Sequence, residues 1–164
     1  MRETNILIEK AKPDDVQEML LVINKANREA FVGIIPKEHF REPIITHEQF
    51  NECSERMTFY VHRQKGVVVA VAALGAEDQD CGRIRWVYVL REYQRQGIGT
   101  ALVLHLEREA RGMGLSRARL VTDNDATWAI AFYERLGYTL TRRVPNPWGF
   151  DSWMEKPLSR LGRE

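Results

Sequence analysis

Two glycines, one residue apart, lie where a predicted strand passes directly into a predicted helix. Gly97 and Gly99 belong to the segment 94–100, and Arg91 and Arg95 lie close to them in the chain. Amides in the first turn of a helix have no acceptor within the helix, and glycine lets a bulky group approach the backbone. Because the helix dipole also favours an anion there, we expect this segment to bind a pyrophosphate, with the two arginines available for a further phosphate.

The same glycine pattern also fits a tight turn that binds no ligand. Two other phosphate-binding loops fit the sequence poorly. A Walker loop requires Gly-Lys-Ser/Thr, whereas Gly99 is followed by Thr100 and Ala101, and the dinucleotide fingerprint requires a third small residue where Leu102 stands. The loop alone therefore predicts phosphate binding without identifying the ligand.

A tyrosine in a second aromatic segment could supply acid chemistry. Four residues of this segment, 128–138, share one face of a predicted helix, namely Ala129, Phe132, Tyr133 and Leu136. Aromatic residues at this spacing usually pack in a core. The phenol of Tyr133 could also donate a proton to a thiolate leaving group, because the two groups have similar pKa values.

The hydrophobic periodicity predicts the elements that would position these residues. Strands are expected at residues 5–11, 57–63, 67–74, 83–90, 117–122, 138–143 and 148–156. Helices are expected at 47–54 and 127–136, in the segment that follows Pro13, and from Ile98 up to Gly112. In the strand 83–90, alternation predicts one face with Ile84, Trp86 and Tyr88 and the other with Arg85, Val87 and Val89. This order predicts an α/β domain with a mixed, largely antiparallel sheet of about seven strands and helices on both faces.

Composition narrows the class of protein. The 164 residues, 44% hydrophobic and 29% charged, suit one globular domain over residues 1–164. No apolar run approaches the roughly 20 residues that span a bilayer, and no secretory signal follows Met1, so we expect a cytoplasmic protein with no membrane partner. Positive and negative side chains number 24 and 23, which argues against nucleic-acid binding. Cys53 and Cys81 form neither a disulfide framework nor a metal motif, so we expect no metal.

Together, the two segments resemble the GNAT superfamily of acyl-CoA N-acyltransferases. Gln94-x-x-Gly97-x-Gly99 is similar to the family's Gln/Arg-x-x-Gly-x-Gly/Ala loop, and residues 132–138 are similar to its later helix. The resemblance covers residues 5 to about 158 and is sharpest over 84–138. It implies the GNAT fold, acetyl-CoA as cosubstrate and a small-molecule or protein amine as acceptor. It also makes a homodimer a possible assembly, because dimers are common among the relatives.

The resemblance also implies roles for individual residues. The pantetheine arm would bond to the backbone of Val87, Tyr88 and Val89, and the pyrophosphate to Gln94, Arg95, Gln96, Gly97, Ile98, Gly99 and Thr100. Tyr133 would protonate the departing CoA thiolate, while the Val89 N–H would polarise the thioester carbonyl. Asn124 is carried over as a CoA contact, although it lies nine residues before Tyr133 rather than the family's seven. The implied reaction is direct attack of a neutral amine on the thioester, without an acyl-enzyme.

The sequence leaves the general base and the acceptor open. The strand 83–89 lacks the carboxylate or histidine that some family members use as base, so Glu77, Asp78 or a water chain are the alternatives. We expect the acceptor to lie against residues 27–35 and 145–153, and Arg83 and Arg85 would favour an acidic one. A non-catalytic acyl-CoA-binding module is the alternative function, and a protein that binds another nucleotide is a third.

Overall fold

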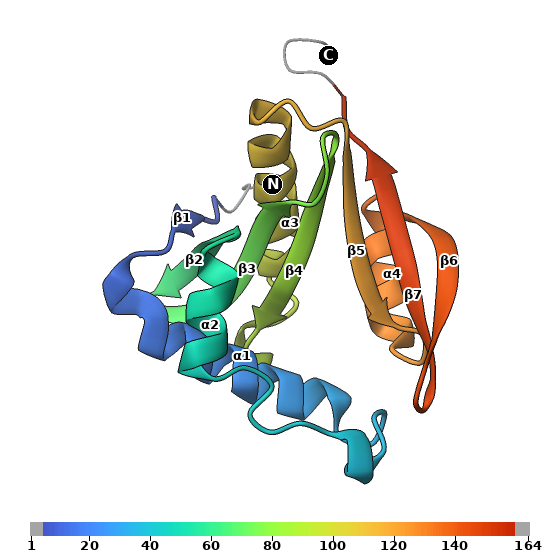
Figure 1. The fold of residues 1–164 in the computed structure, drawn as a ribbon. Helices are drawn as coiled ribbons and strands as arrows, with labels where there is room; N and C mark the ends of the chain where they lie inside the picture. The colour runs from blue at the N-terminus through green and yellow to red at the C-terminus, as the bar shows by residue number, and fades with distance from the viewer. Residues whose placement is uncertain (1–4, 160–164) are drawn as a thin grey trace.

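A seven-stranded mixed sheet forms the centre of the protein in the computed structural model, which describes residues 5–159 (Figure 1). The strands are β1 (Glu9–Lys10), β2 (Met57–Gln64), β3 (Val67–Ala76), β4 (Cys81–Val89), β5 (Arg117–Asp123), β6 (Thr139–Asn146) and β7 (Gly149–Pro157). Their order in the sheet is β1-β2-β3-β4-β5-β7-β6. Among the strands of the described residues, only β4 and β5 pair in parallel, which confirms the predicted largely antiparallel sheet.

Helices cover both faces of this sheet, as expected. Helices α1 (Val16–Phe31) and α2 (His47–Ser54) lie on one face, and α3 (Ile98–Gly112) and α4 (Thr127–Arg135) lie on the other (Figure 1). Short 3-10 turns occur at η1 (Pro13–Asp15), η2 (Lys37–His39) and η3 (Arg91–Tyr93). The first strand is shorter than the predicted 5–11, and the Leu7 carbonyl oxygen lies 2.8 Å from Nδ1 of the His62 ring.

The central strand β3 separates two hydrophobic cores. Eight of its ten residues are buried, because its run of valines and alanines meets a helix on each face. Under α1 and α2 the core contains Met19, Ile23 and Phe50, whereas under α3 it contains Leu102 and Leu106. Each such fully buried side chain contributes about 1.5–3 kcal/mol. The two cores hold β4 firmly between α1 and α3.

A bulge in β4 overturns the predicted division of its side chains between two faces. Val71 and Ala73 of β3 pair with Tyr88 and Arg85, so β4 carries one extra residue between these two pairs. Trp86, within this bulge, has a left-handed φ of +59°. Ile84 therefore lies in the core under α3, on the same side as Val87 and Val89, while Trp86 and Tyr88 pack on the α1 side.

The sheet opens into a wedge between β4 and β5. The two strands pair only at Cys81–Arg83 with Arg117–Arg119, and beyond these pairs both continue without bonding to each other (Figure 1). Helix α3 has six buried residues, spaced three or four positions apart along one face. No residue of α4 is fully buried. Helix α4 therefore forms an accessible wall of the wedge.

Candidate active site

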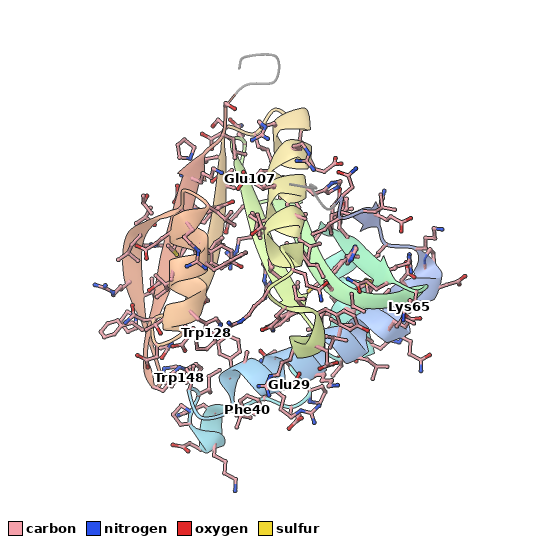
Figure 2. All side chains as sticks on the ribbon, turned by 180° about the vertical axis from the view of Figure 1, so that it is seen from behind. Glu29, Phe40, Lys65, Glu107, Trp128 and Trp148 are labelled. Atoms are coloured by element: carbon pink, nitrogen blue, oxygen red, sulfur yellow. The ribbon has the colours of Figure 1, made fainter. Side chains whose placement is uncertain are left out.

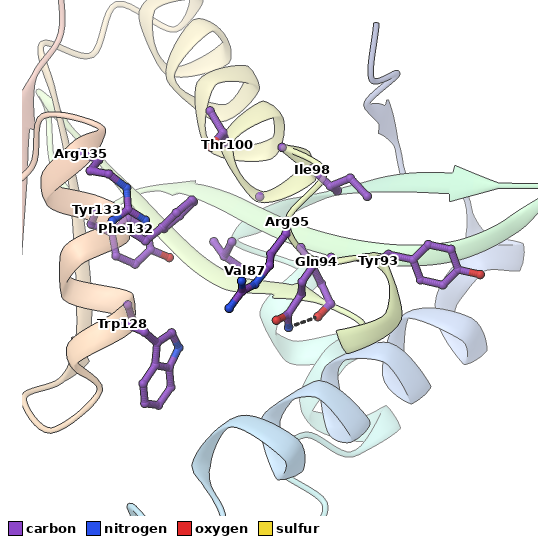
Figure 3. A pocket seen from close by; sticks show the side chains of 14 residues that line it. Val87, Tyr93, Gln94, Arg95, Ile98, Thr100, Trp128, Phe132, Tyr133 and Arg135 are labelled. Atoms are coloured by element: carbon purple, nitrogen blue, oxygen red, sulfur yellow. Dashed lines mark hydrogen bonds between the residues drawn. The ribbon is translucent and has the colours of Figure 1, made fainter. Parts of the chain in front are cut away.

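A cavity of about 570 Å³ fills the wedge on the side of α3 and α4 (Figure 3). Two continuous segments line it, one running from the end of β4 into α3 and one along α4. The lining residues are Val87, Val89, Tyr93, Gln94, Arg95, Gly97, Ile98, Gly99, Thr100, Trp128, Ala129, Phe132, Tyr133 and Arg135. The structure thus brings the two segments singled out in the sequence to one cavity.

Residues of the loop before α3 and of its first turn, 95 and 97–100, line this cavity. Gly97 is the N-cap of α3 with φ of +83°, and Arg95 has φ of +64°. The first amide of the helix with a backbone acceptor is that of Ala101, which donates to the Gly97 carbonyl at 3.0 Å. Within residues 5–159, no acceptor meets the amides of residues 95–100. Six donors beside a helix N-terminus favour a negatively charged ligand.

The absence of a side chain at Gly99 keeps the cavity open. A Cβ at this position would lie 3.3 Å from Phe132 Cζ and 3.9 Å from Val89 Cγ2. Any larger side chain would therefore fill the space between the start of α3 and helix α4.

Two arginines add positive charge to the cavity. Arg95 and Arg135 both line it, and neither forms an ion pair with a described residue. Arg91, also expected near a phosphate, instead donates to the Glu29 carbonyl at 3.3 Å. Arg135 was not among the predicted site residues, although it lies two residues after Tyr133 in a helix already expected to face the ligand.

Tyr133 lines both the large cavity and a smaller one that extends toward α1. Its ring packs against Phe132 and Tyr138, with centroid distances of 5.0 and 5.8 Å. Burial raises the pKa of the Tyr133 phenol far above its usual value, and the neighbouring Tyr88 raises it further. The phenol is therefore fully protonated at neutral pH and available as a proton donor.

The open edge of β4 supplies a backbone donor close to Tyr133. Leu90 donates to the Val69 carbonyl of β3 at 3.0 Å, and successive residues of a strand direct their amides to opposite edges. The Val89 N–H and carbonyl therefore point toward the unpaired edge. Gln94 Nε2 donates to this carbonyl at 3.0 Å (Figure 3), so the Gln94 side chain occupies an acceptor that the sequence analysis assigned to pantetheine.

Two smaller cavities extend from the wedge toward α1. One, of about 200 Å³, shares Val89, Gln94 and Tyr133 with the large cavity. The other, of about 400 Å³, shares Arg85, Trp86 and Tyr88 with the smaller one. Through these shared residues the three cavities form a series from the loop before α3 to the α1 side.

The segments expected to bind the acceptor contribute to the third cavity. Asn27, Phe31 and Ile35 line it from the α1 side, Trp148 lines it from the β6–β7 turn, and Asp151 lines it from the start of β7. Trp148 packs on His39 with a centroid distance of 5.4 Å, and its indole N–H donates to Asp123 at 2.6 Å. Figure 2 shows Trp148 and Trp128 at the same end of the wedge.

Several predicted residues are placed elsewhere. Asn124 lines none of the three cavities, and its Oδ1 accepts from Ser152 Oγ at 2.8 Å and Arg143 Nε at 3.0 Å. Gln96 accepts from Gln64 at 3.2 Å, and Tyr88 lines the two smaller cavities rather than the large one. The alternative bases, Glu77 and Asp78, form ion pairs beside the start of β4 and line none of the three cavities.

A family model described as the Acetyltransferase (GNAT) family matches residues 18–138. The chain belongs to this family. The match includes both segments that line the large cavity, so the expected GNAT membership and fold are confirmed. The description of this family agrees with the expected acetyltransferase activity.

Similar proteins agree with this family. The Bacillus subtilis (strain 168) protein YdhI is 31% identical over 94 residues, which cover 57% of this chain and 57% of YdhI. An amino-acid acetyltransferase of Pseudomonas putida is 31% identical over 116 residues, covering 68% of this chain and 27% of that enzyme. The chain thus covers less than two thirds of the length of both relatives. YncA of Salmonella typhimurium, whose structure was solved with acetyl-CoA, shares the fold with a TM-score of 0.75 at 20% identity over 98% of each chain.

The described residues contain neither a metal-ligand group nor a membrane-spanning helix. Within residues 5–159, no three His, Cys, Asp or Glu side chains gather in a way that could hold a metal ion. In the same residues, no helix has both the length and the apolar character needed to cross a bilayer.

Proposed function

We propose that this protein transfers an acetyl group from acetyl-CoA to an amine by direct attack, with Tyr133 as general acid. The observation that carries the proposal is a series of three cavities in which neighbours share lining residues. The series runs from the unpaired amides at Gly97 and Gly99, past the Val89 backbone and the Tyr133 phenol, to a separate cavity beside α1.

Binding of the cosubstrate uses the side of the wedge that faces α3. The amides of residues 95–100 bind the pyrophosphate, and Arg95 and Arg135 supply charge to the phosphates. The open edge of β4 bonds the pantetheine arm in the manner of an added strand. For this to include the Val89 carbonyl, the Gln94 side chain must leave it or share it.

The reaction requires a neutral amine, a polarised carbonyl and a proton for the leaving sulfur. The amine nitrogen forms a bond to the thioester carbon while the carbon–sulfur bond breaks. The Val89 N–H stabilises the negative charge that develops on the carbonyl oxygen. Tyr133 donates its phenolic proton to the sulfur, and the proton that the amine loses restores the phenol through solvent.

The cavity of about 200 Å³ is the middle one of the three, and in it the amine would meet the thioester. No carboxylate or histidine lines this middle cavity. Asp123 and Asp151 line the adjoining third cavity. We therefore place the removal of the amine proton on a water path toward these two carboxylates, in place of the earlier candidates Glu77 and Asp78.

The decisive experiment combines a binding and a turnover measurement. Calorimetry with CoA should show saturable binding, and incubation with acetyl-CoA and a panel of amines should release free thiol. Saturable CoA binding with no thiol release from any amine would support the non-catalytic alternative. Absence of CoA binding by the folded protein would exclude both functions.

A further inference from the structure

We propose that the acceptor carries a carboxylate beside its reacting amine, and that Arg85 and Asn27 bind this carboxylate. The inference rests on the proposed function and specifies its substrate class as amino acids. Arg85 lines both cavities on the α1 side of the wedge, and Asn27 lines the larger of them. The smaller cavity also contains Tyr133 and Val89, so a carboxylate at Arg85 lies near the reaction centre.

Arg85 is held in place without a counter-ion. Its Cζ lies 4.9 Å from the centroid of the Trp86 ring, and none of its nitrogens pairs with a carboxylate of the described residues. A guanidinium stacked on an aromatic ring keeps its N–H donors free at the edge of its plane, and this fork matches the two oxygens of a carboxylate.

Arg83, the other arginine of the third cavity, differs in this respect. Its Nη1 donates to Glu77 at 3.2 Å, and its guanidinium lies 5.3 Å from the centroid of the Trp153 ring. The sequence analysis gave both arginines the same role, but only Arg85 lines this cavity without a carboxylate partner among the described residues.

Asn27 supplies a second donor from α1. The residue is only 5% exposed, and its Oδ1 accepts from the Tyr88 hydroxyl at 2.9 Å. Its Nδ2 makes no hydrogen bond with any described residue. This donor is therefore available to an oxygen of a ligand in the third cavity, which Asn27 lines.

The charges at the far end of the third cavity fix the orientation of the acceptor. Asp123 and Asp151 are cross-strand partners there, and both accept only from uncharged donors within residues 5–159. They repel a carboxylate. The carboxylate end of the acceptor is therefore directed to Arg85, while the remainder extends between Phe31 and Trp148.

The test compares amino acids with their primary amides, such as leucine with leucinamide, at equal concentrations of neutral amine. The wild-type protein should favour the acids by at least about tenfold in kcat/KM, as expected for a charged hydrogen bond. Arg85→Gln should abolish this preference through the acceptor KM, and Arg85→Lys should restore part of it. The KM for acetyl-CoA should stay unchanged in both variants.

Two further variants separate recognition from structure. Asn27→Asp keeps an acceptor for the Tyr88 hydroxyl but replaces the free donor by an anion. It should therefore lower kcat/KM for the amino acids and leave kcat/KM for their amides unchanged. Arg142→Gln is the matched control, because Arg142 also stacks on a tryptophan, Trp153 at 4.4 Å, but lines none of the three cavities. It should retain the preference.

Equal turnover of acids and amides, or a preference that survives Arg85→Gln, would overturn the inference and leave the acetyltransferase proposal intact. If no amine in the panel is acetylated, the proposed function itself fails, and the substrate class fails with it.

Discussion

Strand β4 separates two sides of the wedge that are built differently. On the α3 side, two continuous segments, 87–100 and 128–135, line the cavity. On the α1 side, the third cavity is lined from four separate regions, 27–44, 83–88, 121–123 and 148–151. The lining of the large cavity therefore depends on one loop and one helix. The lining of the third cavity can be altered by substitutions in one region while the other three stay the same. Substitutions in one of these regions can therefore alter the third cavity without altering the large one.

The largest effect is expected where the two sides meet. Tyr133→Phe removes only the phenolic hydroxyl group from the residue that lines both the large and the middle cavity. Loss of general acid catalysis should lower kcat by about 100-fold, while calorimetry shows an unchanged Kd for CoA. A variant that keeps full kcat would remove Tyr133 from the chemistry.

A substitution confined to the α3 side should weaken the binding of the cosubstrate alone. Gly99→Leu places a side chain against Phe132 and into the phosphate cavity, and should raise the Kd for CoA by at least about tenfold because bound atoms are displaced. Gly112→Ala is the control, since a Cβ at this end of α3 meets no atom within 4 Å. If Gly99→Leu binds CoA normally, the cosubstrate lies elsewhere.

These two predictions concern the part of the site that could be predicted from the sequence. The loop at Gly97 and Gly99 and the helix at Tyr133 are local patterns, so their chemistry can be recognised from neighbouring residues. The predicted helix 47–54 was confirmed with its limits for the same reason, since Thr46 caps it and Gln49 completes a capping box.

The rest depends on contacts between distant residues. The bulge at Trp86 reverses the face of part of β4, and nothing in the alternation of residues 83–89 indicates it. That Arg85 and Asn27 have free donors becomes apparent only when the positions of all possible acceptors around them are known. Asn124 is likewise bound to Ser152 and Arg143, which follow it by 28 and 19 residues.

On the α1 side, truncation of a lining side chain should affect the binding of the acceptor alone. Phe31 lines both smaller cavities and packs on Trp128 with a centroid distance of 5.9 Å. Phe31→Ala should raise the acceptor KM by about tenfold, the usual effect of losing apolar contact in a pocket. Steady-state kinetics with each substrate varied in turn will show whether the KM for acetyl-CoA changes as well, which would contradict the separation of the two sides.

Outside both sides, stability should change without any effect on turnover. Asp15 accepts two hydrogen bonds from Arg63, at 2.6 and 2.8 Å, and these hold the pKa of its carboxyl below the usual value. Its ionised form therefore stabilises the fold above about pH 4, and this contribution is lost as the pH falls through the lowered pKa.

Asp15→Asn should accordingly lower the free energy of unfolding by about 1–3 kcal/mol at pH 7. Urea unfolding at a series of pH values should show the difference from wild type shrinking below about pH 4. A changed kcat at 25 °C in the folded variant would show that α1 transmits strain to the wedge.

The central claim is that the main-chain amides before and within the first turn of α3 bind the pyrophosphate of CoA. A titration of ¹⁵N-labelled protein with CoA, followed by amide NMR, tests it residue by residue. The amide resonances of residues 95–100 should shift most and saturate together. Saturable CoA binding that leaves these six resonances unmoved would contradict the account.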